Sequence, residues 1–417
     1  MPLFQKNLPT TMFSSSWRNK SPRSSLPPIA KRMFLLAFMT EFIVIYPFYV
    51  IMFGQRGHVS AASVGALLAI WMVVSVLAEV PTGVIADRFS KKWSLVIGQA
   101  LQLATFTVWL AAPNFLGYLA GFVLWGAGEA FLSGASQAYL YESLDDAHRK
   151  IFGKIYARSS AFTMMAYFAG SLLAFVIGPH YDVLLLASMA VSLIALGITL
   201  GLPATRSQVQ IEIRPKILSS ALRAIRSHPA LRQILIGAVI IQGLMSMLGE
   251  YLPQYYQQVG TPLHAVPLFI AVGSLAAAGL YWWMHRIETQ ISRYQPLIAG
   301  GFLGLFVVSF WIGTAAAVIG MFVFTRVLRM LSVHNESHIQ HHAPNEARAT
   351  VGSLYSFAAK LVSAGAVSLV GAFAVHNKII VPVRWSAIIG ITAFLLISLH
   401  SLISLRKKSH VLEHSPT

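Results

Sequence analysis

Long apolar runs separated by short polar interruptions follow one another along the chain from residue 31 to residue 405. Each run has about 20 residues, which is long enough to cross a hydrocarbon core of roughly 30 Å as a helix, and a helix satisfies every backbone N–H and C=O group inside lipid. The predicted spans are 31–53, 63–85, 93–112, 116–140, 152–177, 183–202, 231–251, 263–285, 294–312, 315–333, 349–374 and 383–405. The alternating polarity of a transmembrane β-barrel is absent. The pattern therefore predicts an all-α membrane protein with twelve transmembrane helices.

The longest polar interruption inside this region, residues 203–230, divides the spans six plus six. That division predicts two repeated halves, 31–202 and 231–405, joined by a cytoplasmic linker. In the linker, apolar residues recur at helical spacing and predict a short amphipathic helix on the membrane surface: Ile217, Leu218, Ala221, Leu222 and Ile225. Residues 1–30 are rich in Ser and Pro and contain no acid, so we expect a disordered basic tail, with a transit peptide as the alternative. Residues 406–417 are expected to form a second cytoplasmic tail.

Composition and charge agree with a membrane protein. The chain is 56% hydrophobic and 11% charged, with a mean hydropathy of +0.65. Most of its 31 Lys and Arg residues fall in alternate connections, and with the amino terminus inside only Arg56, Lys378 and Arg384 would lie outside. Positive loop residues remain on the cytoplasmic side, so both termini are predicted there. The net charge of +17 is then expected to meet anionic lipid headgroups rather than nucleic acid.

The most informative connection joins the second and third spans. It reads Glu79-Val-Pro-Thr-Gly83, three further residues, Asp87-Arg88, and then Lys91-Lys92. This pattern resembles the loop between the second and third helices of the major facilitator superfamily, although Ser90 stands where the family usually has Gly. The segments Gly126-Ala-Gly-Glu-Ala-Phe-Leu-Ser-Gly134 and Arg348-Ala-Thr-Val-Gly-Ser353 are similar to sequences in bacterial exporters of that family. The resemblance implies two six-helix halves around a central cavity.

The resemblance also implies a latch between the halves. In the family, the Asp of the loop faces the start of the eleventh helix, so Asp87 would lie near Ala349, and the Arg meets an acid at the inner end of the fourth helix. Glu142 is then the expected partner of Arg88, with Asp145 behind it. Physically, a carboxylate is attracted to a helix N-terminus and an arginine forms charge-assisted bonds to a carboxylate. The alternative is that Gly83, Asp87, Arg88, Lys91 and Lys92 form an ordinary loop whose charges fix topology.

Ionisable residues at membrane depth are costly and are by default functional candidates. The predicted spans contain seven such candidates: Glu41, Glu129, Arg158, Glu250, Arg326, Arg329 and Lys360. Glu41 and Glu129 are candidates for proton coupling or for binding a cationic substrate. Alternatively, each glutamate is paired with Arg158, Arg326 or Lys360 as interhelical structure. Arg326 and Arg329 lie three apart on one helical face, which suits a substrate carboxylate or phosphate, or a role as counter-ions of the glutamates.

Several kinds of chemistry have no support in the sequence. The absence of cysteine excludes disulfides and thiol catalysis, and no phosphate-cradling Gly-Lys-Ser/Thr motif or nucleophile elbow is present. Four histidines at helical spacings could in principle gather a metal, but we expect a solvated cytoplasmic loop there: His334, His338, His341 and His342. We therefore expect no enzyme activity, no metal and no cofactor.

Taken together, these features predict a monomeric secondary transporter in the cytoplasmic membrane of a bacterium, driven by a proton gradient. Its partners would be a small-molecule substrate and membrane lipid. Export of an amphiphilic or toxic compound by alternating access is the favoured interpretation, because it follows from the resemblance. Uptake of an anionic or zwitterionic solute is the main alternative, suggested by Arg326, Arg329 and Lys360. A receptor or assembly factor on the same scaffold is a third, which the intramembrane charges disfavour.

Overall fold

A computed structural model describes residues 26–88, 90–204, 225–227, 229–312, 314–342 and 348–413. The first half contains α1 (Pro28–Glu41), α2 (Tyr49–Gln55), α3 (Ala61–Arg88), α4 (Lys91–Ala111), α5 (Phe115–Glu142), α6 (Asp146–Arg149), α7 (Phe152–Ile177) and α8 (Tyr181–Leu200). The second half contains α10 (Pro229–Val259), a 3-10 turn (Leu263–Ala265), α11 (Val266–Ile312), α12 (Thr314–His342), α13 (Arg348–Ala372) and α14 (Ile380–Glu413). Four residues of the predicted surface helix lie outside the described residues, and Ile225 begins a short helical segment, 225–227. The four are Ile217, Leu218, Ala221 and Leu222.

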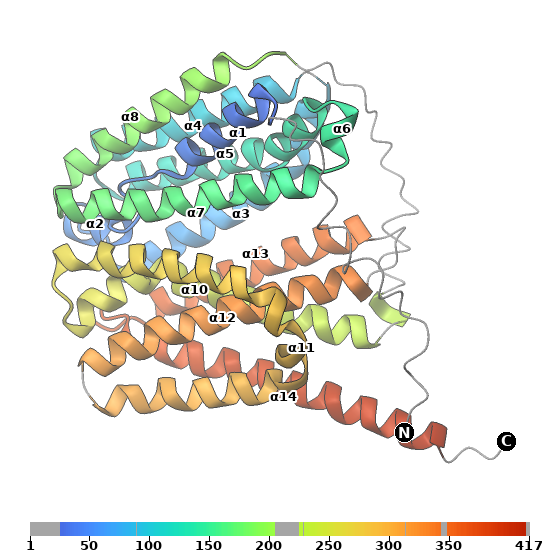
Figure 1. The fold of residues 1–417 in the computed structure, drawn as a ribbon. Coiled ribbons are helices and arrows are strands. Elements are labelled where there is room, and N and C mark those ends of the chain that lie inside the picture. Colours follow the sequence, from blue (N-terminus) through green and yellow to red (C-terminus); the bar gives the residue numbers. More distant parts are fainter. Residues whose placement is uncertain are drawn as a thin grey trace.

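The helices follow the predicted apolar runs closely. Within the described part of the chain, eight helices are long and apolar enough to cross a membrane. Two shorter apolar stretches, Leu263–Ala276 and Leu297–Ser309, lie along the 3-10 turn and α11. Figure 1 shows α11 turning back on itself, so that it supplies two of the predicted spans. The structure is thus all-helical in its described spans, as predicted.

Four boundaries differ from prediction. The first span, predicted as one helix over 31–53, is broken between Glu41 and Tyr49. Helix continues through the loop predicted at 286–293, and α12 runs on past residue 333 to His342. The predicted tail 406–417 is helical as far as Glu413. Hydropathy marks where a segment leaves the apolar core, whereas a helix can extend beyond that point, so the last three differences share one cause.

The break in the first span lies inside the bundle. A backbone that leaves the helix at membrane depth must find hydrogen-bond partners elsewhere. Here the N–H of Ile45 donates to Ser188 Oγ on α8 at 3.0 Å. The segment is enclosed by apolar packing, because Val44, Ile45 and Phe48 are fully buried. The break places Glu41 at the end of a discontinuous helix, which is where many membrane proteins build binding sites.

The two halves face each other across three helix pairs. In Figure 1 the helices of the first half lie above those of the second, and α3 packs on α13, α7 on α11, and α2 on α10. The α3–α13 approach is close, because a Cβ at Gly65 would lie 2.8 Å from the carbonyl oxygen of Val367 and 3.0 Å from Gly371 Cα. The Ala61 N–H also donates to Asn377 Oδ1 at 2.9 Å. These contacts close one end of the bundle, which we call the sealed end.

Candidate functional site

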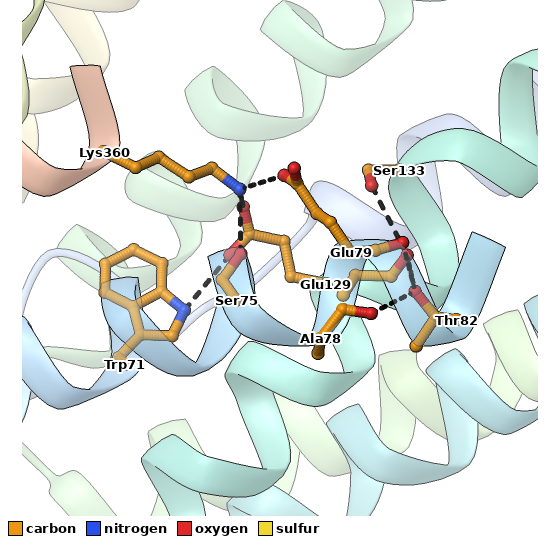
Figure 2. Close-up of polar contacts among 9 residues, drawn as sticks. Trp71, Ser75, Ala78, Glu79, Thr82, Glu129, Ser133 and Lys360 are labelled. Carbon is orange, nitrogen blue, oxygen red and sulfur yellow. Dashed lines mark hydrogen bonds and ion pairs between the residues drawn. The ribbon is translucent and has the colours of Figure 1, made fainter. Parts of the chain in front are cut away.

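A lysine from the second half reaches across to acids of the first half (Figure 2). Lys360 Nζ on α13 lies 2.6 Å from Glu79 Oε1 on α3 and donates to Ser75 Oγ at 2.9 Å. The same nitrogen lies 3.6 Å from Glu129 Oε1 on α5. The indole N–H of Trp71 donates to the other oxygen, Glu129 Oε2, at 3.1 Å. One ammonium therefore joins three helices from both halves.

The spacing of residues on α3 creates this cluster. Trp71, Ser75 and Glu79 are separated by four residues each and so lie along one helical face. The α5 backbone can approach that face because a Cβ at Gly126 would lie 2.8 Å from the carbonyl oxygen of Trp71. The hydroxyl of Thr82 donates to the Ala78 carbonyl of its own helix at 2.7 Å and also lies 3.2 Å from the Ala130 carbonyl on α5. Gly126 belongs to a segment that the sequence had already singled out.

The three charged side chains are only partly buried. The exposed fractions are 28% for Lys360, 38% for Glu79 and 36% for Glu129. Two carboxylates share one ammonium, so the cluster has a net charge of −1 when all three groups are ionised. The 3.6 Å contact of Glu129 is longer than a charge-assisted hydrogen bond, which is about 2.7–2.9 Å. Glu129 therefore binds Lys360 more weakly than Glu79 does, and it is the acid that can more easily bind a ligand.

Glu129 also lines a cavity of about 390 Å³ between α1, α4, α5 and α7. Its deep part is aromatic, with Tyr46, Trp71 and Trp125, and it extends along the helices to Tyr156 near the start of α7. That direction leads away from the sealed end. A cavity with aromatic walls and a few polar groups is the usual form of a small-molecule site.

Glu41 faces the same cavity from the end of α1. The hydroxyl of Tyr167 on α7 donates to Glu41 Oε2 at 2.7 Å. The sequence left a cationic partner open for Glu41, and the hydrogen bond that the structure gives it comes from a neutral tyrosine. Glu41 and Glu129 therefore line the same cavity.

Glu250 has a different setting. It is 6% exposed on α10, and Tyr49 on α2 donates a hydrogen bond to Glu250 Oε2. This contact joins the two halves beside the sealed end, among fully buried aromatic side chains such as Phe48 and Phe53. Glu250 does not line the cavity of Glu41 and Glu129. Glu250 therefore forms a polar contact between the two halves at the sealed end.

The three predicted arginines have different surroundings in the structure. Arg326 donates to the carbonyl of Gly273 on α11 and lies over the ring of Phe322, 5.5 Å from its centroid. Arg329 lies one turn further along α12 and is half-buried. No hydrogen bond or ion pair joins Arg329 to another residue within the described part of the chain. Arg158 is exposed on α7 and does not line the cavity.

Comparison with known proteins identifies the fold. The family model of the Major Facilitator Superfamily matches residues 33–368, which is well over half of the chain. The chain belongs to the Major Facilitator Superfamily. It is an integral, multi-pass membrane protein. A search of curated protein sequences gives no match.

Solved structures with this fold include three transporters. A D-xylose-proton symporter is 12% identical, with a TM-score of 0.70 and coverage of 88% of this chain and 96% of that chain. The nucleoside transporter NupG is 14% identical, with a TM-score of 0.67 and coverage of 90% and 99%. A bacterial homologue of the human lysosomal transporter Spinster, in an inward-facing and occupied conformation, is 13% identical, with a TM-score of 0.68 and coverage of 91% and 96%. At these identities the likeness shows the fold alone.

The structure describes part of the superfamily loop and one of its contacts. The side chains of Asp87 and Arg88 lie outside the described part of the structure, so their predicted contacts remain predictions. Glu142 is held by Lys91, with 2.7 Å between Lys91 Nζ and Glu142 Oε1, and these side chains are only 5% and 20% exposed. Lys92 is half-buried and Gly83 is exposed, and a Cβ added at Gly83 would meet no atom within 4 Å. The loop therefore contacts the fourth span through Lys91.

Asp145 was expected behind Glu142 as a second partner of Arg88. The structure instead makes it the N-cap of α6, because its Oδ1 accepts from the backbone N–H of His148 at 2.9 Å. That N–H and the His148 ring hold the pKa of the exposed Asp145 carboxyl below its usual range. An aspartate at this position satisfies a free N–H at the start of the helix. The sequence signal was an Asp directly before a short polar helix.

The buried Lys91–Glu142 pair yields a stability prediction. Replacing Glu142 with Gln removes the negative charge beside a lysine that is 4% exposed, and breaking such a pair costs about 1–3 kcal/mol when one partner keeps some access to water. We expect the thermal midpoint of the purified protein in detergent to fall by several degrees. Asp146→Asn is the control, because its side chain is 95% exposed in the pair with Arg149 and should change nothing. An equal midpoint for Glu142→Gln and wild type would show that the pair does not stabilise the fold.

The histidine cluster was predicted to lie in a solvated loop, and this is wrong. His334 and His338 lie on α12, with ring centroids 4.3 Å apart, and His334 is 1% exposed. The side chains of His341 and His342 fall outside the described ones. In the part searched, no group of three or more His, Asp or Glu side chains could hold a metal ion. The helix persists because the apolar face of α12 continues past the end of its hydrophobic core, with Ile339 buried.

The sequence interpretation missed Glu79, Tyr49, Gln99 and Gln102. Glu79 was quoted as the start of the superfamily loop, yet it also lies inside the predicted span 63–85 and is an ionisable residue at depth. Counting it with Glu41 and Glu129 would have found the acid that binds Lys360. Tyr49 and the two glutamines gave no such signal, because neutral polar residues are common in membrane helices.

Proposed function

We propose that this protein exports an amphiphilic organic cation in exchange for protons, with one cavity opening alternately to either side of the membrane. The observation that supports this best is the pair of carboxylates, Glu41 and Glu129, on an aromatic-lined cavity. A cation and a proton would compete for the same carboxylates. Competition for one site is the simplest physical basis of exchange, because binding of one releases the other.

The Lys360 cluster supports the coupling part of the proposal. Lys360 belongs to the second half and both of its acids belong to the first, so any rocking of the halves must change their distances. Protonation of Glu129 would leave Glu79 as the remaining anionic partner of Lys360. Occupancy of the cavity is thereby linked to the strength of the contact between the halves.

The orientation remains the one predicted from charge, with both termini in the cytoplasm. On that orientation the sealed end faces outward, and the cavity extends toward the cytoplasm. A substrate would enter from the cytoplasm in this conformation. The direction of flow follows from the proton gradient, which runs inward across a bacterial cytoplasmic membrane.

Export is tested in two ways. A host without its own pumps should tolerate more of some cationic compounds when it expresses the chain, in a screen of a toxic-compound panel. Purified protein in liposomes should then drive accumulation of such a compound against its gradient when a pH difference is imposed. Unchanged tolerance for every compound, together with no flux under a pH difference, would contradict the proposal.

A second candidate is uptake of an anionic or zwitterionic solute. Arg329 supports it, since this side chain is half-buried at membrane depth and has no ion pair in the described structure. Lys360 and Arg326 support it less, because Lys360 is held by two acids and Arg326 by a backbone carbonyl. Accumulation of a carboxylate-bearing solute, lost in Arg329→Gln, would favour this candidate.

The α3–α13 contact predicts a variant that favours opening of the sealed end. Gly65→Val adds three carbons where even a Cβ would lie 2.8 Å from the Val367 carbonyl oxygen, and overpacking of this kind costs about 1–3 kcal/mol. We expect a cysteine at Leu68, which is fully buried here, to react at least about tenfold faster with an impermeant thiol reagent outside the cell. The chain has no natural cysteine to interfere. Gly197→Val is the control, because a Cβ at Gly197 meets nothing within 4 Å, and equal reactivity in both variants would contradict the expected opening.

A further inference from the structure

Two buried glutamines on α4 line the same cavity as the carboxylates. Gln99 is fully buried and Gln102 is 6% exposed. Gln102 Nε2 donates to the backbone carbonyl of Thr40 at 3.1 Å, and Gln99 Nε2 donates to the Thr40 hydroxyl at 2.6 Å. Thr40 directly precedes Glu41, so the glutamines are anchored beside the acid at the end of α1.

The side-chain oxygens of both glutamines accept no hydrogen bond from the described residues. Gln99 Oε1 and Gln102 Oε1 are buried and have no hydrogen-bond partner among the residues that the structure describes. The orientation of Gln102 is fixed, because a backbone carbonyl only accepts and must therefore face the amide nitrogen. Its oxygen consequently points elsewhere as an unused acceptor. A buried acceptor without a donor is unfavourable, and a ligand that supplies a donor removes that penalty.

These groups distinguish between kinds of cation. Glu41, Glu129 and the two amide oxygens are all acceptors, and the aromatic rings of Trp71 and Trp125 attract any positive charge. A quaternary ammonium offers charge without N–H groups, so it would leave the amide oxygens unsatisfied. A protonated primary amine offers charge and three N–H donors. Missing hydrogen bonds to buried polar groups give stronger discrimination than missing apolar contacts.

We propose that the cavity selects protonated amines that carry N–H donors over quaternary ammonium ions, and that Gln102, with Gln99, determines this preference. The direction in which such an amine moves rests on the proposed export function. The preference in binding does not.

The test is equilibrium binding to the purified full chain by calorimetry. The probes are 2-phenylethylammonium and its N-methyl, N,N-dimethyl and N,N,N-trimethyl derivatives, which share one ring and one charge. We expect the primary ion to bind at least about tenfold more tightly than the trimethyl ion, with affinity falling as each N–H is replaced. Equal affinities along the series, or no measurable binding of the primary ion, would overturn the proposal even without any variant.

Variants then assign the preference to residues. Gln99→Met combined with Gln102→Met should weaken binding of the primary ion about tenfold and leave binding of the trimethyl ion within about twofold. Gln55→Met is the matched control, because Gln55 is exposed at the end of α2 and does not line the cavity, so both affinities should stay unchanged. An equal loss of affinity for both ions in the double variant would overturn the role of the glutamines. Preferential binding of the primary ion without proton-driven flux in liposomes would instead contradict export and leave this inference standing.

Discussion

Replacing Lys360 with Met is expected to lower proton-driven transport by roughly tenfold to a hundredfold. The variant removes the one cation that Glu79 and Glu129 share, and it leaves two like charges on neighbouring helices. Removing one partner of a fully buried pair costs about 3–5 kcal/mol, and the partial exposure of these groups reduces that figure to about 1–3 kcal/mol. The rate is measured in liposomes under an imposed pH difference.

The Lys360 prediction has two controls. Lys360→Arg keeps the charge and should recover much of the rate, since an arginine can also donate to two carboxylates. Lys378→Met removes a charge from an exposed position near the sealed end and should leave the rate unchanged. A Lys360→Met protein that folds, as judged by its thermal midpoint, and transports at the wild-type rate would show that the bridge between the halves is not needed.

The broad fold could be predicted from the sequence because lipid imposes one dominant constraint. A run of apolar residues such as 183–202 has few alternatives to a membrane-spanning helix, and α8 occupies Tyr181–Leu200. The same reasoning failed at Phe42–Phe48, which is as apolar as a helix and is not one. Pro47 lies in this segment, has no backbone N–H and disfavours the interior of a helix, so it is the local signal that the hydropathy pattern overlooked. The hydrogen bond from Ile45 to Ser188 joins the segment to a distant helix, and no local pattern records it.

The site was predictable as a set of charges but not as a set of contacts. Glu41, Glu129 and Lys360 were identified as candidates because a charged side chain at membrane depth is energetically costly and is by default functional. Which charges meet depends on how the helices pack, both within a half and between the halves. Arg326 donates to a backbone carbonyl within the second half, and Glu250 accepts from Tyr49 of the first half. The first turn of α4 places the buried Lys91 beside Glu142, a contact that the resemblance did not predict, while the expected contact of Arg88 remains a prediction.

Glu129→Gln is expected to abolish accumulation of substrate under a pH difference while exchange of labelled for unlabelled substrate continues. A one-for-one exchange of a monovalent cation for a proton moves no net charge, so each pH unit can drive about a tenfold concentration ratio, which corresponds to 1.36 kcal/mol. A glutamine cannot release a proton, so the ratio should fall to about one. The amide is nearly isosteric and can still accept from Trp71, which is why binding and exchange should survive.

The same measurement on Glu41→Gln and on the double variant separates the two acids. If Glu129 alone carries the proton, Glu41→Gln keeps the tenfold ratio and weakens only binding of the cation, because no cationic side chain is paired with Glu41 among the described residues. If either acid suffices, only the double variant reaches a ratio of one. Glu79→Gln is the matched control, since Glu79 binds Lys360 at 2.6 Å but does not line the cavity, and it should slow transport without changing the ratio. A tenfold concentration ratio in the double variant would show that another group carries the coupling proton. The long contact between Glu129 and Lys360, at 3.6 Å, would then have no role in exchange.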